Sequence, residues 1–464
     1  MKKEITWSIF ERISTQAFQL IFLILISRTI GPDQYGLMAI IVVFIAVGNV
    51  IVDAGFSSAL IRKEKVTEID LSTLLYFSLL IALVLYAVIY SASFMIASYY
   101  DNSVLVNLIK LTGLSVIINS LCIPHKVIIN HNLKFKIQAK ISIVSVICSG
   151  SVGYLLATNG YGVYSLVFQT LVFSLCNLFL SIVFIGWVPI LKFSLKSLRY
   201  MFAFGNKIFI SSIVSTLFDN VYQIVIGKNF SPSVVGGFSQ AKTLSSMPAI
   251  TISTAIQRVT YSSFSKLYHN NQNYNDAFLK SLKLTALLCF PPMMILASIS
   301  KPLVMIVLGS EWNHTGDFIM LLCFSYMLYP IHAQTLSILQ SIGDSSSYFI
   351  LEMTKKLVII IFIYITHDDI LFMIYGIVAQ SYVFILVNYY FLKNRISLSF
   401  KQYCKPWVFI WIFSVMSFLL SYAFQELFSS YIEKFFSGLS LSLAIFLLLG
   451  FLFKKSLISF GIVK

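Results

Sequence analysis

The chain has 464 residues, of which 58% are hydrophobic and 11% are charged, and its mean hydropathy is +0.86. A soluble domain needs about a quarter charged residues to cover its surface, so most of this surface must face something other than water. The formal net charge of +15 does not indicate nucleic-acid binding, because the Lys and Arg lie between long apolar runs and not on one basic face. This distribution favours contact with phospholipid headgroups.

Apolar stretches long enough to cross about 30 Å of hydrocarbon recur along the whole chain. The sequence therefore predicts an all-α polytopic membrane protein with about 14 transmembrane helices. The predicted spans are 6–28, 35–60, 71–99, 104–127, 136–158, 162–188, 204–228, 232–257, 278–300, 315–341, 347–366, 369–392, 405–425 and 436–459. Twelve spans with two peripheral helices is the alternative, and the short apolar piece at 302–309 is interpreted as a lateral segment.

The positions of the basic residues test this assignment of spans independently, because Lys and Arg concentrate on the cytoplasmic side of membrane proteins. With both termini in the cytoplasm, the inner gaps and the adjoining helix ends hold most of the 33 Lys and Arg. The opposite side holds Arg28, Lys228, Lys301 and Lys434. The charge pattern thus predicts that both termini are cytoplasmic.

The Met1–Glu4 start resembles that of a signal peptide, but no cleavage pattern follows, so we interpret it as part of a retained first span.

The chain also repeats itself. The segment SRTIGPDQYG at 27–36 resembles GKNFSPSVVG at 227–236, and MIAS at 95–98 resembles ILAS at 295–298, both at an offset of about 200 residues. Six spans separate the copies, so the copies share one orientation, as in a parallel repeat. We predict two pseudo-symmetric six-helix lobes, 1–190 and 191–395, around a central cavity, with two additional helices in 396–464.

No catalytic or metal-binding motif is present in the sequence. There is no Walker A, GxSxG or HExxH pattern, and the six Cys form no CxxC pair. Of the His residues, His125 and His332 are interpreted as structural more readily than catalytic. We therefore expect no enzymatic step, no metal and no cofactor.

Ionisable residues inside the predicted spans are the informative ones, because each costs several kcal/mol unless it faces a cavity or a partner. Among them, Glu11, Arg12, Asp53, Lys110, Asp219 and Lys242 are the candidates. Asp219 and Lys242 both fall about 14 Å below the outer end of their hairpin. This depth predicts either a structural ion pair or a charged cavity wall. Glu11, Arg12 and Asp53 form either a charged inner mouth or a stabilising cluster.

Two further cations close equivalent hairpins on the outer side. Arg28 and Lys228 occupy the same place in the two copies of the repeat, which makes them candidates for an outer gate. The alternative is that both side chains extend to the outer headgroups.

Three stretches resemble a known family. The run IGPDQYGLMAIIVVFIAVGNVIVDAGFSSALIRKE at 30–64 is similar to the first hairpin of bacterial polysaccharide-repeat-unit flippases of the Wzx type. VVGGFSQAKTLSSMPAITISTAIQRVTYSSFSKL at 234–267 looks like the eighth span of that family, and KFKIQAKISI at 134–143 is also family-like. The resemblance covers most of 1–400 and is closest to the branch associated with exopolysaccharide and lipopolysaccharide biosynthesis.

The resemblance implies a fold and a function. The fold would be the two-lobe architecture of the multidrug/oligosaccharidyl-lipid/polysaccharide (MOP) exporter superfamily, in the bacterial inner membrane. The substrate would be an oligosaccharide on undecaprenyl diphosphate, moved to the periplasmic leaflet by alternating access, with H⁺ or Na⁺ coupling possible. Members of the family are expected to work beside a polysaccharide polymerase and a chain-length regulator.

Site residues follow from combining the resemblance with the charges. Arg12, Lys110 and Lys242 are the candidate contacts of the diphosphate, and Glu11, Asp53 and Asp219 are the candidate coupling or ion-pair residues. This chain departs from the related lipid II flippases, because it has Asp53 on the second span where those proteins carry Arg.

Two other functions stay open from the sequence. A cation-coupled small-molecule exporter of the same superfamily would use Asp53 or Asp219 as its coupling acid. A membrane polysaccharide polymerase or glycosyltransferase would be expected to show a large extramembrane loop.

Overall fold

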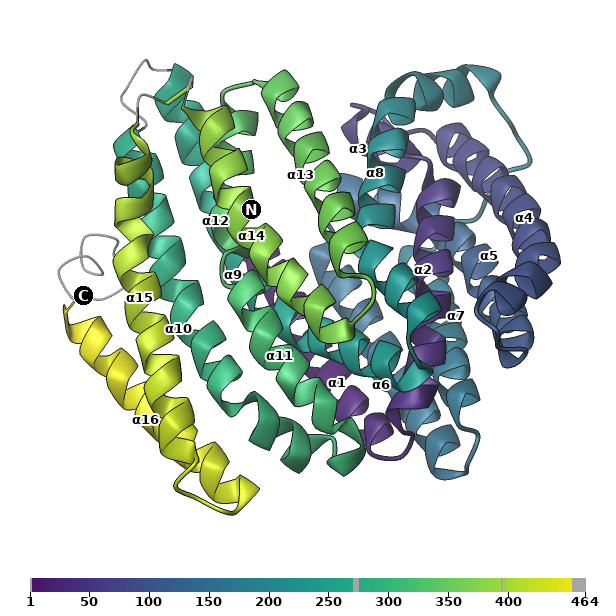
Figure 1. Cartoon of the computed structure of the whole chain (residues 1–464). Helices are drawn as coiled ribbons and strands as arrows, with labels where there is room; N and C mark the ends of the chain where they lie inside the picture. The colour runs from purple at the N-terminus through teal and green to yellow at the C-terminus, as the bar shows by residue number, and fades with distance from the viewer. Residues whose placement is uncertain (1, 270–274, 394, 397, 453–464) are drawn as a thin grey trace. The chain divides into compact units, whose positions relative to one another are not determined.

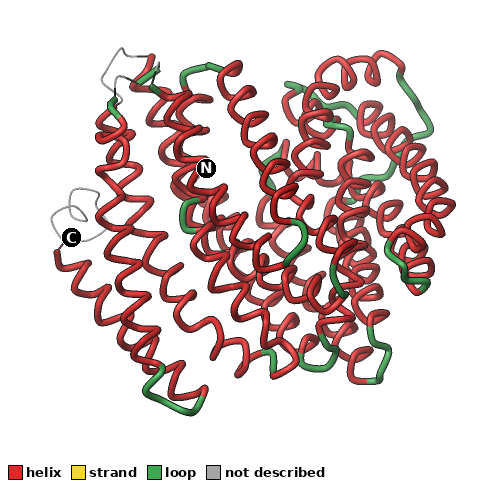
Figure 2. Tube along the Cα trace, in the orientation of Figure 1, coloured by secondary structure: helices red, strands yellow, loops and turns green. Residues whose placement is uncertain are grey.

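The computed structural model describes residues 2–269, 275–393, 395–396 and 398–452 (Figure 1). In these ranges the chain consists of helices joined by short turns, with no strand (Figure 2). The prediction of an all-α protein is therefore confirmed. The chain divides into two compact units, unit 1 at Met1–Gly236 and unit 2 at Gly237–Lys464.

Unit 1 contains eight helices and the first residues of a ninth. They are α1 Lys2–Ser27, α2 Pro32–Asp53, α3 Phe56–Arg62, α4 Glu68–Tyr99, α5 Val104–His131, α6 Phe135–Thr158, α7 Val163–Ile185, α8 Leu195–Asn229 and the start of α9 Pro232–His269.

Unit 2 contains the rest of α9 and the remaining helices. They are α10 Asn275–Val307, the short 3₁₀ helix η1 Ser310–Trp312, α11 Asn313–Tyr326, α12 Tyr329–Ser341, α13 Ser345–Thr366, α14 Ile370–Leu392, α15 Phe400–Gln425 and α16 Tyr431–Leu452. In this unit α10, α15 and α16 pack side by side, as Figure 1 shows.

Local sequence explains where several helices begin. Helix α2 begins at Pro32, whose missing N–H would have no helical partner in any case. Thr67 and Asp70 form a reciprocal capping box at the start of α4, and Ser399 and Gln402 form one at the start of α15.

A buried carboxylate joins three segments at one end of unit 1. Asp70 is 1% exposed. It accepts hydrogen bonds from Lys63 Nζ at 2.6 Å and from Ser197 Oγ at 2.6 Å. Because a buried charge needs several partners to offset its lost hydration, Asp70 fixes the start of α8 against the α3–α4 turn.

Twelve helical segments of the described chain are long and apolar enough to cross a membrane. They coincide with all the predicted spans except 232–257 and 347–366. Helices do occupy those two positions, as α9 and α13. However, α13 carries Glu352, Lys355 and Lys356, and many Ser, Thr and Gln residues interrupt the apolar residues of α9. The chain is a multi-pass membrane protein, and the count of fourteen spans stays a prediction.

Two predicted spans and the predicted lateral segment differ from the helices observed. The span 35–60 is broken after Asp53, because Ala54 and Gly55 both adopt left-handed φ angles of 45° and 71°. The span 315–341 is divided into α11 and α12 around Met327–Leu328, and Pro330 lies in the first turn of α12. The piece at 302–309 is no separate segment, since α10 continues to Val307.

Helix starts in the second half follow those in the first half. Helices α2 and α9 begin at Pro32 and Pro232, and α6 and α7 correspond to α13 and α14 at offsets of about 200 to 210 residues. The order of helices is thus consistent with an internal repeat. The lobe boundaries at 190 and 395 stay predictions. The division into compact units at residue 236 reflects contacts within each unit and does not test the repeat.

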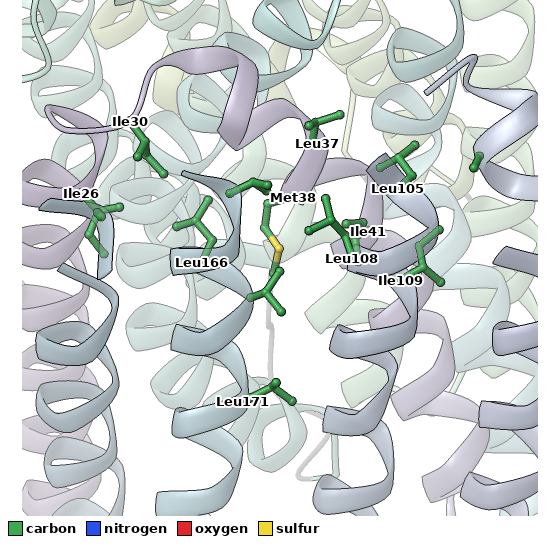
Figure 3. Close-up of a cluster of buried hydrophobic side chains, with 14 residues drawn as sticks. Ile26, Ile30, Leu37, Met38, Ile41, Leu105, Leu108, Ile109, Leu166 and Leu171 are labelled. Atoms are coloured by element: carbon green, nitrogen blue, oxygen red, sulfur yellow. The ribbon is translucent and has the colours of Figure 1, made fainter. Parts of the chain in front are cut away.

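A cluster of buried aliphatic side chains holds unit 1 together near the α1–α2 turn. Figure 3 shows side chains from α1, α2, α5 and α7 converging there, among them Ile26, Met38, Leu108 and Leu166. Lipid chains are as apolar as these residues, so close packing, more than hydrophobicity, favours their association within a membrane.

Candidate functional site: charges within the membrane helices

Glu11 and Arg12, on α1, are half-buried. Ser142 Oγ, from α6, donates to Glu11 Oε1 at 2.7 Å. Thr15 Oγ1 donates to the backbone oxygens of Glu11 and Arg12 at 2.7 and 3.1 Å. The structure therefore ties the Glu11 carboxylate to α6.

The Asp53 carboxylate lies at the break between α2 and α3. It accepts a hydrogen bond from Ser57 Oγ, in the first turn of α3. The break brings the backbone close to α8, since a Cβ on Gly55 would lie 2.8 Å from the Gly205 oxygen. Asp53 and Glu11 thus have separate hydroxyl partners, on α3 and on α6.

Lys110 faces aromatic rings of α4. Its Nζ lies 4.3 Å from the centroid of the Tyr90 ring and 4.5 Å from that of Phe94. Both rings are among the exposed large apolar side chains. A cation over exposed aromatic faces is typical of an anchor at the membrane interface, so this geometry favours an anchoring role for Lys110.

The predicted outer-gate cations have different surroundings. Arg28 is exposed in the α1–α2 turn. Lys228, at the end of α8, donates to the Tyr99 backbone oxygen at 2.6 Å and to Asp101 Oδ2 at 3.1 Å. The second hairpin is therefore fastened to the α4–α5 turn of unit 1.

A close helix crossing lies beside these hairpins. A Cβ on Gly36 would overlap the backbone oxygen of Pro232, and a Cβ on Gly236 would overlap that of Pro32. These four residues match pairwise in the repeat, so the crossing between the first turns of α2 and α9 is itself symmetric. Glycine at both positions allows the two backbones to touch.

Asp219 and Lys242 belong to different units. Asp219 is exposed on α8 in unit 1, and Lys242 is half-buried on α9 in unit 2. Their pairing stays a prediction.

Unit 2 contains two buried lysines that the sequence interpretation does not single out. Lys355 and Lys356 on α13 are 7% and 8% exposed. Glu352 Oε1 lies 3.4 Å from Lys355 Nζ. Lys355 lies about 15 Å along α13 from Ser345, well within a membrane-length helix. The signal that identifies them is their place inside the predicted span 347–366, although the charge pattern assigns them to the cytoplasmic end of that span.

A polar network lies next to Lys355. His332 on α12 has Asn388 Nδ2 at 2.9 Å from its Nδ1 and Ser381 Oγ at 3.3 Å from its Nε2. Ser381 Oγ donates in turn to the Ser325 oxygen at 3.2 Å. With the proton assigned to Nε2, this chain satisfies a neutral imidazole, which favours the structural interpretation of His332. The ring of Phe384 faces both His332 and Lys355.

Known proteins are similar to this chain in sequence and in fold. Residues 25–317 match the model of a family described as polysaccharide biosynthesis protein. The teichuronic acid biosynthesis protein TuaB of Bacillus subtilis is 27% identical over 57% of this chain and 55% of its own length. The lipopolysaccharide biosynthesis protein WzxC of Escherichia coli is 23% identical over 70% of this chain and 66% of its own. The aligned chain thus spans between about half and two thirds of these relatives.

Among solved structures, the lipid II flippase MurJ in an inward closed conformation superposes with a TM-score of 0.77 at 18% identity, over 99% of this chain and 100% of the other. An inward-facing multidrug resistance MATE family transporter of the MOP superfamily has a TM-score of 0.63 at 15% identity, over 84% and 98%. These likenesses establish the fold predicted from the resemblance. Because the family model covers more than half of its length, this chain belongs to the polysaccharide biosynthesis protein family of multi-pass membrane proteins.

Proposed function

We propose that the protein moves an oligosaccharide linked to undecaprenyl diphosphate from the cytoplasmic to the periplasmic leaflet of the bacterial inner membrane. The family, the names of the relatives and the flippase fold support this proposal. They favour a transporter over a polymerase or glycosyltransferase. The product would serve O-antigen, capsule or exopolysaccharide synthesis, beside a polymerase and a chain-length regulator.

The observation that carries the proposal is the buried cationic charge on α13. Lys355 and Lys356 are both buried, whereas Glu352 is the one acid of that helix. Charged side chains inside membrane helices usually mark a substrate or ion path, and buried lysines suit an anion as the substrate. A diphosphate is such an anion, and the hydrocarbon chain of the carrier lipid would remain in the bilayer.

Each unit provides further cations for the diphosphate. In this proposal Arg12 of unit 1 and Lys242 of unit 2 contact the phosphate groups at stages of alternating access. Arg28 and Lys228 contribute to the outer gate. Coupling to H⁺ or Na⁺ would use Glu11, Asp53 or Asp219.

The direct test is the leaflet location of the lipid-linked oligosaccharide in cells lacking the gene. We expect accumulation on the cytoplasmic side, relieved when the gene is restored. Normal translocation with shortened polymer would instead indicate an enzyme acting after translocation. Normal polymer with altered drug resistance would indicate a small-molecule exporter.

Variants of the two cations test the residues separately. Arg12→Ala and Lys242→Ala should each reduce export at unchanged protein levels in the membrane. If both variants export as well as the original protein, these charges are structural and the diphosphate binds elsewhere.

A further inference from the structure

Unit 1 contains a cavity that the charges do not reach. Its volume is about 310 Å³, and it lies among α1, α2, α6 and α7. The lining residues are Gln19, Phe22, Leu23, Tyr35, Val146, Ser149, Leu166, Gln169, Thr170 and Phe173. None of them is ionisable near neutral pH, so the cavity offers no charge to a phosphate group.

The glutamines of the cavity lie at similar distances from two helix turns of unit 1. Gln19 is about 12 Å along α1 from the α1–α2 turn, and Gln169 is about 9 Å along α7 from the α6–α7 turn. In the predicted orientation both turns are on the outer side. The cavity therefore occupies the outer half of the membrane.

Two glutamine amides in the cavity lack protein partners. Within the part of the chain that the structure describes, neither the Gln19 nor the Gln169 side chain makes a hydrogen bond. The hydroxyls beside them are satisfied, since Ser149 Oγ donates to the Val146 oxygen at 3.2 Å and Thr170 Oγ1 to the Leu166 oxygen at 2.9 Å. Gln19 is exposed and Gln169 is half-buried, so both amides are open to a polar occupant of the cavity, and such a partner stabilises an amide at membrane depth.

Glycines of α6 make room for two of the lining side chains. A Cβ on Gly150 would overlap the Phe22 ring, and a Cβ on Gly153 would lie 3.0 Å from Cβ of Gln169. Phe22 and Gln169 can thus lie directly across the backbone of α6. Their positions in the cavity depend on these two small residues.

The lining has the chemistry that binds a neutral sugar. Amide groups exchange hydrogen bonds with hydroxyls in both directions, and the rings of Phe22, Tyr35 and Phe173 offer apolar faces to the C–H groups of a pyranose. The volume is at the lower end for ligand pockets, enough for about one sugar residue. A lipid tail would leave both amides without partners.

We propose that this cavity binds one uncharged sugar residue of the lipid-linked oligosaccharide, with Gln19 and Gln169 as its hydrogen-bonding groups. This assignment rests on the proposed function. It separates recognition of the sugar, in unit 1, from neutralisation of the diphosphate by cations.

The test compares two lipids on the full chain in nanodiscs. One probe is the undecaprenyl-diphosphate-linked oligosaccharide from the cells that make it, and the other is undecaprenyl diphosphate without sugar. Binding is measured by native mass spectrometry for the original protein, for Gln19→Leu and for Gln169→Leu. Asn177→Leu is the matched control, because Asn177 is an amide of the same helix α7 that does not line the cavity.

We expect each Gln variant to bind the sugar-bearing lipid about tenfold more weakly, the effect of losing a net hydrogen-bond energy of about 1.4 kcal/mol. Binding of undecaprenyl diphosphate, and both affinities of Asn177→Leu, should be unchanged. If a Gln variant binds both lipids equally more weakly, the glutamine has a structural role and the sugar site is overturned. If the Gln variants bind the sugar-bearing lipid as well as the original protein does, the sugar site is also overturned, and the cavity holds only water. If the original protein binds neither lipid, the proposed function fails and the sugar site with it.

Discussion

At the scale of single residues, the buried charges of α13 provide the sharpest prediction. Lys355 is buried in unit 2, and its ammonium faces Glu352. Removing one member of a buried pair costs about 3–5 kcal/mol, whereas replacing both members can be nearly neutral. A double replacement therefore separates a structural charge from a functional one.

The prediction is that Lys355→Met lowers both stability and export, and that Glu352→Gln in addition restores the stability alone. Thermal unfolding of purified protein and export in cells are the two measurements. Lys393→Met is the control, since Lys393 is exposed at the end of α14. Export that returns with stability in the double variant would show that the pair is purely structural.

Another residue-scale prediction concerns pH. Asp344 caps α13: its Oδ1 accepts from the Ser347 N–H at 3.0 Å, and its Oδ2 lies 2.6 Å from Arg395 Nε. The hydrogen bond from Ser347 is the main cause that lowers the pKa of Asp344 from its ordinary value of 3.8, and Arg395 lowers it further. A lowered pKa means that the ionised form is favoured by folding, so the stabilisation is present above pH 3.8 and is lost as the pH falls below it.

We expect Asp344→Asn to be less stable than the original protein at pH 7, with the difference shrinking as the pH falls toward 3. Unfolding measured across this range in detergent checks the prediction. A stability difference that stays constant with pH would show that the Asp344 charge contributes nothing.

At the scale of helices, the crossing of α2 with the start of α9 is set by two glycines. Because a methyl group at Gly36 or Gly236 would meet backbone and not a flexible side chain, the helices must separate to admit it. Overpacking of this kind costs about 1–3 kcal/mol. Gly48, on the same helix α2, has only ordinary contacts with Leu85 and Val116 around it.

Gly36→Ala and Gly236→Ala should therefore each destabilise the protein by about 1–3 kcal/mol, and Gly48→Ala should not. The double variant should cost less than the sum, because one displacement of the helices accommodates both methyl groups. Comparing the unfolding of the four variants tests this prediction. If Gly36→Ala is as stable as Gly48→Ala, the crossing has room that the structure does not show.

At the scale of the whole molecule, the distribution of basic residues predicts the orientation. The turn at Asn102, between α4 and α5, should face the periplasm, and the turn at Asn132, between α5 and α6, should face the cytoplasm. Single cysteines at these positions in a cysteine-free background, labelled by an impermeant reagent on intact spheroplasts, test this. Labelling at 132 and not at 102 would reverse the assignment of both termini.

Much of the architecture could be predicted because hydropathy and charge act locally. Twelve of the predicted spans coincide with apolar membrane-length helices, since each such helix satisfies its own backbone hydrogen bonds. The break after Asp53 could not be predicted, because it depends on left-handed Ala54 and Gly55 in contact with Gly205 on a distant helix. The candidate site could be predicted only as a set of ionisable residues along the spans.

The sequence by itself determined the membrane class and the order of most helices, and it predicts the internal repeat, because these depend on composition and on local periodicity. Tertiary structure decided which charges are buried and what surrounds each one. It placed Lys110 against Tyr90 and Phe94, buried Lys355 beside Glu352, and gathered Gln19 and Gln169 around one cavity. Such relations join residues far apart in the chain, and the direction in which a side chain points across a bundle depends on how the helices pack, which no single span specifies.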